Sequence, residues 1–278
     1  MIAEKGDAKT LRVQNVSRAF GALTVLDSIN LTVGRGEFVA LVGPSGCGKT
    51  TLLNLLSGYD IPTSGTIERP ASVRRVYQQD GLLPWLTVRE NIALGKRDQS
   101  KAASGTAKSA SENSASVEAI SKKTDVQKSG SEKSDNTFVS GDVAELLHLV
   151  GLEEFADAYP YQLSGGMRQR AELARALGGN TDLLLLDEPF SALDYLTRLR
   201  LRQELGRILH LRPTQVVLVT HDIEEASQLA DRVLVLSARP GRIRCEIPIS
   251  LPRPRPPMHP EVIAAARRIL TEMGLEES

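Results

Sequence analysis

A glycine-rich stretch near the start of the chain could hold the phosphates of a nucleotide. The segment GPSGCGKT, residues 43–50, has the spacing G-x-x-x-x-G-K-[ST]. Glycines in such a loop let the backbone curl, so that several N–H groups converge on phosphate oxygens. We expect Lys49 to place its positive charge on the β- and γ-phosphates and the hydroxyl of Thr50 to ligate Mg²⁺. These residue types at this spacing predict a nucleoside triphosphate site.

Two adjacent carboxylates end an apolar run, LLLLDEP, at residues 183–189. Asp187 is placed to hold the Mg²⁺ shell, and Glu188 could polarise an attacking water as a general base. The competing interpretation is that the two acids merely end a strand and face solvent. Next to a phosphate loop, the chemical interpretation is favoured.

His221 and Gln78 each follow an apolar strand-like segment. Parallel sheets place ligands beyond the carboxyl ends of their strands, and both residues would lie there. A lone histidine is more often structural than catalytic, so neither residue is convincing by itself.

A second glycine pair opens a helical pattern far along the chain, in LSGGM at residues 163–167. Ser164, Gly165 and Gly166 would leave backbone N–H groups and a positive dipole end free, which suits an anion. The chain therefore has two candidate phosphate cradles.

Short apolar strands alternate with amphipathic helices around these residues, which predicts an α/β fold with a mostly parallel sheet covered on both faces. The first helix should end at Gly58, a residue type that often follows a helix C-terminus. The expected strands span residues 11–20, 29–43, 73–79, 182–188, 214–221 and 232–237, and the expected helices span residues 49–59, 143–152, 166–177 and 261–273.

One internal stretch does not fit this alternation. Residues 96–136 are rich in Ser, Lys, Ala and Glu and have no aromatic residue. Such a composition buries too little apolar surface to offset the entropy of ordering, so we expect a disordered insertion. A solvated loop extension is the plainer interpretation, and a regulatory or docking segment is the alternative. After Ser250 a Pro-rich connector leads into the last helix.

Composition narrows the class of protein. The 278 residues carry 34 Lys plus Arg and 34 Asp plus Glu, and this balance gives no reason to expect nucleic acid as a partner. Cys47 and Cys245 are the only cysteines, which fits a reducing compartment. The N-terminus shows no signal peptide and no apolar run is long enough to span a membrane, so a membrane role would come through a partner.

Taken in order, GPSGCGKT, VYQQDGLLPW, LSGGM, LLLLDEP, SALD and VTHD resemble the nucleotide-binding subunit of an ABC transporter. The resemblance covers nearly the whole chain except residues 96–136. It implies a P-loop NTPase fold with a mostly parallel sheet, an antiparallel β subdomain and a helical subdomain at about residues 84–177. The ATPase domain would then span residues 10–245, and residues 246–278 would form the connector and C-terminal helix.

The resemblance also implies a role for each matching residue. Phe20 would stack on adenine, and Ser191–Asp194 would form a loop that crosses a dimer interface. The implied nucleotide-binding residues are Phe20, Gly43, Pro44, Ser45, Gly46, Cys47, Gly48, Lys49, Thr50, Thr51, Ser164, Gly165, Gly166 and Asp194. The implied catalytic set is Lys49, Gln78, Glu188 and His221, and the implied Mg²⁺ ligands are Thr50, Gln78 and Asp187.

Family geometry implies that Ser164 and Gly166 face the γ-phosphate held by Lys49 of a second copy. The expected assembly is thus a pair of ATPase subunits, with ATP and Mg²⁺, on separate permease subunits at the cytoplasmic face of a bacterial inner membrane. A solute-binding protein would deliver the solute. QDGLLPWLTVRENIALG, THDIEEA, LSARPGRI and LPRPRP are similar to importers of nitrate, sulfonates and taurine. An exporter subunit, a non-transport ABC ATPase and a catalytically dead scaffold are the alternatives.

Some positions leave questions open. Met167 stands where the family usually has glutamine, and the segment from Lys49 to Gln78 is short, which indicates a trimmed β-hairpin. Trp85 would be either a packed core anchor or part of a surface facing the permease. Cys47 would be either a small filler residue or an exposed, reactive thiol inside the phosphate loop.

Overall fold

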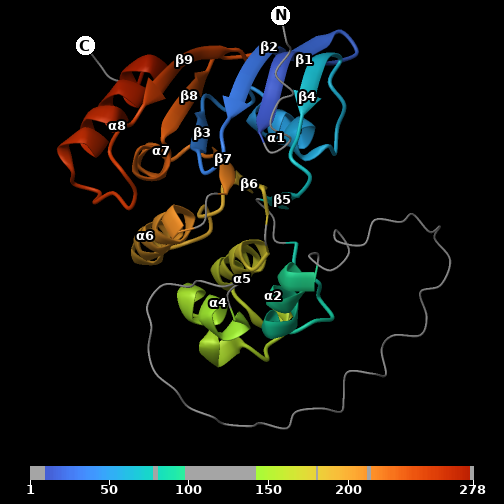
Figure 1. The fold of residues 1–278 in the computed structure, drawn as a ribbon, viewed down its shortest axis with the longest axis vertical. Coiled ribbons are helices and arrows are strands. Elements are labelled where there is room, and N and C mark those ends of the chain that lie inside the picture. Colours follow the sequence, from blue (N-terminus) through green and yellow to red (C-terminus); the bar gives the residue numbers. More distant parts are fainter. Residues whose placement is uncertain (1–9, 78–80, 98–141, 180, 212–213, 276–278) are drawn as a thin grey trace, which may run out of the picture.

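The computed structural model describes residues 10–77, 81–97, 142–179, 181–211 and 214–275. Two sheets with the helices α1 (Lys49–Ser57), α7 (Ile223–Leu229) and α8 (Pro260–Met273) form the upper part in Figure 1, and a group of helices forms the lower part. The α/β class, the mostly parallel sheet, the antiparallel β subdomain and the helical subdomain are confirmed.

The larger sheet has six strands in the order β5-β6-β7-β3-β8-β9. All neighbouring strands are parallel except β8 and β9. The central strands are short and fully buried, as expected for strands covered on both faces. The bounds are β3 Phe38–Val42, β5 Val73–Val76, β6 Leu183–Asp187, β7 Gln215–Val219, β8 Arg232–Leu236 and β9 Ile243–Pro248.

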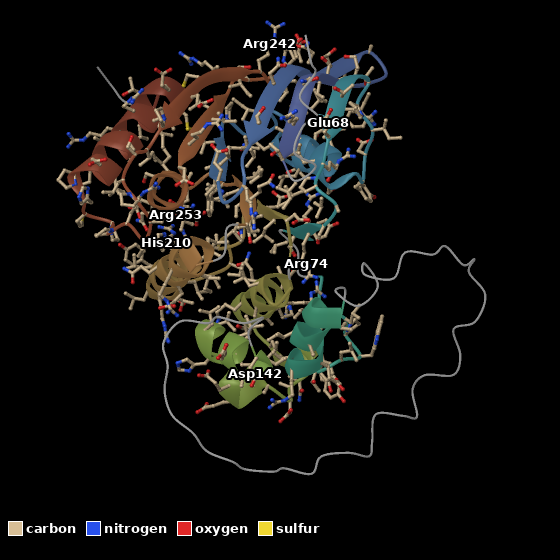
Figure 2. The ribbon with its side chains drawn as sticks, in the orientation of Figure 1. Glu68, Arg74, Asp142, His210, Arg242 and Arg253 are labelled. Carbon is tan, nitrogen blue, oxygen red and sulfur yellow. The ribbon has the colours of Figure 1, made fainter. Side chains whose placement is uncertain are left out.

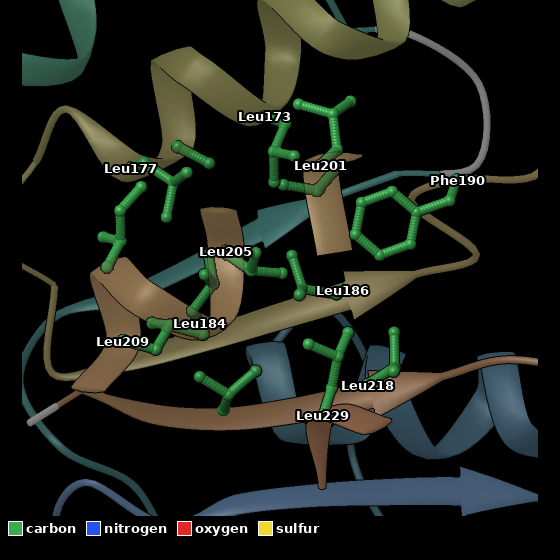
Figure 3. Packing of buried hydrophobic residues seen from close by; sticks show 14 of the residues in the cluster. Leu173, Leu177, Leu184, Leu186, Phe190, Leu201, Leu205, Leu209, Leu218 and Leu229 are labelled. Carbon is green, nitrogen blue, oxygen red and sulfur yellow. The ribbon is translucent and has the colours of Figure 1, made fainter. Parts of the chain in front are cut away.

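Alternate residues of each central strand enter different hydrophobic clusters. Leu183 and Leu185 of β6 join the cluster that contains α1 (Lys49–Ser57), whereas Leu184 and Leu186 join the cluster that contains α5 (Gly165–Leu177) and α6 (Tyr195–Leu211). Figure 3 shows Leu184 and Leu186 against Leu173, Leu205 and Phe190. Because successive side chains point to opposite faces, one apolar strand supports two layers of helices.

The smaller sheet is antiparallel, with three strands in the order β2-β1-β4. Its strands are β1 Leu11–Phe20, β2 Leu23–Val33 and β4 Ser64–Glu68, and β4 is the only strand between α1 and β5. As expected, Gly58 ends α1, with a φ of 80°.

The helical subdomain contains α2 Val88–Arg97, α4 Val143–Val150 and α5. Arg74 of β5 connects it to the larger sheet, because its Nη1 and Nη2 donate to the carbonyls of Arg175 (2.8 Å) and Gly95 (3.0 Å). Figure 2 shows Arg74 between the two parts. The expected insertion at 96–136 lies, from residue 98 on, outside the described residues.

The C-terminal segment packs on the larger sheet. Beyond β9, α8 (Pro260–Met273) lies against α7 (Ile223–Leu229), the helix between β7 and β8. The expected boundary between residues 245 and 246 falls inside β9, and Ile247 and Ile269 belong to the same buried cluster as β6. Among the described residues, no helix is both long and apolar enough to cross a bilayer.

Candidate nucleotide site

The loop GPSGCGKT connects β3 to α1, in the strand–loop–helix context that a phosphate loop needs. Gly48 stands at the N-terminus of α1 with a φ of 104°, and neither a side-chain cap nor an acidic residue in the first turn occupies the helix start. The N-terminal N–H groups and the helix dipole are therefore available to an anion.

Lys49 folds back over this loop. Its ammonium donates to the carbonyls of Gly43 (2.7 Å) and Pro44 (3.0 Å), and it lies 3.8 Å from the sulfur of Cys47. The charge thus lies over the loop, where phosphate oxygens would replace the carbonyls as its partners.

The loop leaves no room for a larger residue at Gly48, where a Cβ would lie 2.7 Å from Cδ2 of Leu26. Cys47 is only 1% exposed, so it is the small filler residue of the two interpretations, and an accessible thiol is not what the structure shows.

Arg239, between β8 and β9, holds the outer side of the loop. Its Nε and Nη2 both donate to the carbonyl of Gly46, at 3.1 and 3.0 Å. Two residues on, a Cβ at Gly241 would lie 2.2 Å from the carbonyl of Cys47. Arg239 lies within LSARPGRI, a segment that pointed only to the subfamily in the sequence.

Asp187 ends β6 and is 4% exposed. Burial raises the pKa of its carboxyl group, and the hydrogen bond from Arg75 opposes that rise. Arg75 Nη2 lies 2.7 Å from Asp187 Oδ2. Sequence reasoning missed Arg75, because its partner follows it by 112 positions.

The residue types of the expected metal ligands suit Mg²⁺. A hydroxyl at Thr50 and the carboxylate of Asp187 are hard oxygen ligands, and magnesium sites use few protein ligands beside waters and phosphate oxygens. Among the described residues, no group of three or more His, Cys, Asp or Glu could hold a metal ion by itself.

Glu188 is held in a strained backbone conformation. Its φ is 49°, unusual for a residue with a side chain, and its carbonyl accepts from Gln169 Nε2 (3.1 Å) and Ser191 Oγ (3.0 Å). His221, just after β7, places Nδ1 3.2 Å from Glu188 Oε1. The structure thus brings together the expected base and the histidine of the implied catalytic set. The sequence did not indicate Gln169 as a support for them.

Phe20 ends β1 and is 50% exposed, as a stacking platform for a base must be. The Arg18 guanidinium lies 4.4 Å from the centre of its ring. Gln78 lies outside the described residues. Trp85 is 69% exposed, so the packed-anchor interpretation is wrong and the surface interpretation remains.

The second glycine loop opens α5. Ser164 caps this helix by accepting the Met167 N–H at 3.2 Å. A Cβ at Gly165 would meet nothing closer than Arg168 Nη2 at 3.9 Å, so this side of the loop is open. In Figure 1, α5 lies with the helical subdomain and α1 lies beside the antiparallel sheet.

Asp194, in the loop before α6, is exposed and accepts the Thr197 N–H at 3.0 Å. The hydrogen bonds from Thr197 lower the pKa of its carboxyl group. Asp194 thus caps a helix and remains accessible to another chain.

Comparisons with known proteins agree with this geometry. The ABC transporter family matches residues 26–191. The chain is 40% identical to the aliphatic sulfonates import ATP-binding protein SsuB 1 of Paracoccus denitrificans, with 99% of this chain and 98% of the relative covered. It is 41% identical to the corresponding SsuB protein of Granulibacter bethesdensis, over 96% of this chain and 95% of the relative.

Solved structures give the same result. The dimeric structure of MJ0796, a bacterial ABC transporter cassette, aligns with a TM-score of 0.63 at 28% identity and covers 86% of this chain and 98% of that one. A post-hydrolysis state of the same cassette bound to ADP and Pi aligns with a TM-score of 0.62. The chain therefore belongs to the ABC transporter family and is one of its ATPases, of the import ATP-binding type.

Proposed function

We propose that this ATPase works as one of a pair of subunits and couples ATP hydrolysis to the import of a small anion, with an aliphatic sulfonate as the first candidate. The relatives at 40 and 41% identity that are named as sulfonate importers support the choice of solute. Nitrate and taurine are the other candidates from the sequence.

One observation carries the proposal. Three neighbouring strands, β6, β7 and β3, end at one edge of the sheet with Asp187–Glu188, His221 and the phosphate loop. Backbone hydrogen bonds join these strand ends. Glu188 N–H donates to the Val219 carbonyl (2.9 Å), and Thr220 N–H donates to the Leu41 carbonyl (3.4 Å). A phosphate cradle, a carboxylate for a metal and a carboxylate for a water are thereby held at one site.

The roles we assign combine these positions with the resemblance, which alone supplies the roles of Gln78 and Phe20. The phosphate loop and Lys49 bind the triphosphate, and Phe20 stacks on the base. Thr50, Asp187 and Gln78 would hold Mg²⁺, which when bound neutralises charge that develops on the phosphates. Glu188 accepts a proton from the attacking water, and His221 orients the Glu188 carboxylate and contacts the γ-phosphate.

Ser164, Gly165, Gly166 and Asp194 complete the site of a second copy in this proposal. The dimeric MJ0796 cassette supports pairing, and the open side of Gly165 supports a contact from outside the chain. The partners are permease subunits at the cytoplasmic face of the inner membrane, with a solute-binding protein that supplies the solute. The exposed Trp85 is our candidate for the surface that meets the permease.

The test is an ATPase assay of the complex with its permease, reconstituted in vesicles with an alkanesulfonate, nitrate or taurine and a binding protein. We expect the alkanesulfonate, but neither nitrate nor taurine, to stimulate ATP hydrolysis. Hydrolysis that ignores all three solutes would contradict the import proposal. Glu188→Gln should lower turnover by about 100- to 10,000-fold, the usual worth of a general base, and leave ATP binding intact. Retained turnover would remove Glu188 from this role.

A further inference from the structure

A buried ion pair joins the expected Mg²⁺ ligand to a neighbouring strand. Arg75 of β5 and Asp187 of β6 lie 2.7 Å apart, and their side chains are 5% and 6% exposed. The strands are parallel neighbours, with Arg75 opposite Leu185, so the pair spans adjacent strand ends. Such a pair is weakly screened by water, and breaking it leaves an uncompensated buried charge.

Other contacts hold the guanidinium in place. Arg75 Nη1 donates to Asn54 Oδ1 of α1, and the guanidinium lies 4.6 Å from the centre of the Tyr77 ring. The Nε atom is buried and has no hydrogen-bond partner. The arginine is therefore aimed at Asp187 at some cost to its own solvation.

We propose that Arg75 is a positioning residue that serves as the internal counter-ion of Asp187, so that Mg²⁺ must compete with the Arg75 guanidinium for this carboxylate. The inference rests on the proposed function, in which Asp187 ligates Mg²⁺. Arg75 holds the Asp187 carboxylate in position in the nucleotide-free subunit, and raises the Mg²⁺ concentration that the subunit needs to load its nucleotide.

The effect follows from charge. A guanidinium and Mg²⁺ repel each other when both face one carboxylate, and in a partly buried site this repulsion is only partly screened. Removal of the guanidinium should lower the Mg²⁺ concentration for half-saturation by about 10-fold, corresponding to a modest fraction of the interaction between two charges at this range.

The experiment titrates Mg²⁺ into the full-length single subunit at pH 8 with a fluorescent ADP analogue, and reads nucleotide binding rather than hydrolysis. Arg75→Met removes the charge and keeps a long side chain, and the expected result is an approximately 10-fold lower half-saturating Mg²⁺. Arg75→Lys keeps the charge but cannot contact both Asn54 and Asp187, and should give a smaller shift in the same direction. If Arg75→Met does not fold, Arg75→Lys decides.

The matched control is Arg74→Met. Arg74 precedes Arg75 on the same strand, contacts the carbonyls of Arg175 and Gly95, and should leave the Mg²⁺ requirement unchanged. An unchanged or higher Mg²⁺ requirement in Arg75→Met, or an equal shift in Arg74→Met, would overturn the proposal.

Asp187→Asn separates this inference from the proposed function. If Asp187→Asn changes the half-saturating Mg²⁺ concentration while the Arg75 variants leave it unchanged, only the counter-ion role fails. If Asp187→Asn itself leaves the Mg²⁺ dependence as it is, Asp187 is not the metal ligand and the proposed site fails with it.

Discussion

The chain has two glycine-rich helix starts, and they differ in how much of each is filled by the chain itself. The loop before α1 is enclosed: Lys49 lies over its carbonyls, Arg239 holds Gly46, and Leu26 crowds Gly48. The loop before α5 is open on one side, with Ser164 at its cap and free space beside Gly165, while Gly166 packs close to the Ala192 carbonyl.

An enclosed cradle can hold phosphate within one subunit, whereas an open one with no lysine among its residues can only add to a site that another surface supplies. The two loops therefore need not compete for one ATP. We infer that the first sets nucleotide affinity and the second completes catalysis across the dimer.

The largest effect on nucleotide binding should come from Lys49→Ala. Loss of the charged hydrogen bonds to phosphate should weaken ATP binding by the isolated subunit by about 100-fold. Isothermal titration of the monomer measures this. Affinity within a few-fold of the unaltered protein would mean that the first loop does not set binding.

Ser164→Arg should lower hydrolysis by the paired subunits by about 100-fold, the usual cost of losing one donor to a reacting phosphate, because the long side chain blocks the open loop. Its monomer should bind ATP normally in the same titration. Weaker monomer binding would place Ser164 in the subunit's own site, and the comparison between the loops would break.

Alanine substitutions at the glycines sharpen the comparison. Gly48→Ala should destabilise the monomer by about 1–3 kcal/mol and lower ATP affinity, because the position has a φ of 104° and no room beside Leu26. Gly165→Ala, with open space, should change the free energy of unfolding by less than about 1 kcal/mol. Thermal and denaturant unfolding of both variants measures these changes. Equal changes in the free energy of unfolding would contradict the prediction.

Arg239→Ala should have the smallest effect, about a fivefold loss of ATP affinity, since it removes hydrogen bonds to one neutral, exposed carbonyl. Arg239→Lys should recover part of it. Arg244→Ala is the control, because Arg244 is an exposed neighbour that faces Glu272 instead. No difference between Arg239→Ala and this control would remove Arg239 from the loop's support.

Local patterns predicted the parts of the fold and site that depend on neighbours in sequence. The strand before Lys49, the helix end at Gly58 and the acids after β6 all come from runs of a few residues, and the structure has them. The domain boundary expected between residues 245 and 246 falls inside β9. The pairing of β9 with β8 depends on tertiary structure and cannot be recognised in a short run of residues.

The contacts that tune the site could not be predicted in this way. Arg239 reaches Gly46 across 193 positions and Arg75 reaches Asp187 across 112. An arginine in a strand or a turn is usually a solvated residue, and only the packing of the sheet shows what it faces. Trp85 was undecided for the same reason, because exposure is a property of the tertiary structure.

The most direct test of a site shared between two subunits mixes two defective ones. In a Glu188→Gln background, the Lys49→Ala and Ser164→Arg proteins are combined with ATP and Mg²⁺. Gel filtration separates dimers from monomers, and the ATP bound per dimer is then measured. A mixed dimer has one intact pairing of Lys49 with the Ser164 of its partner. We predict that mixed dimers form and retain one ATP each, while neither variant pairs with itself. Self-pairing of Ser164→Arg as strong as that of the unaltered chain, or no mixed dimers at all, would contradict the shared site.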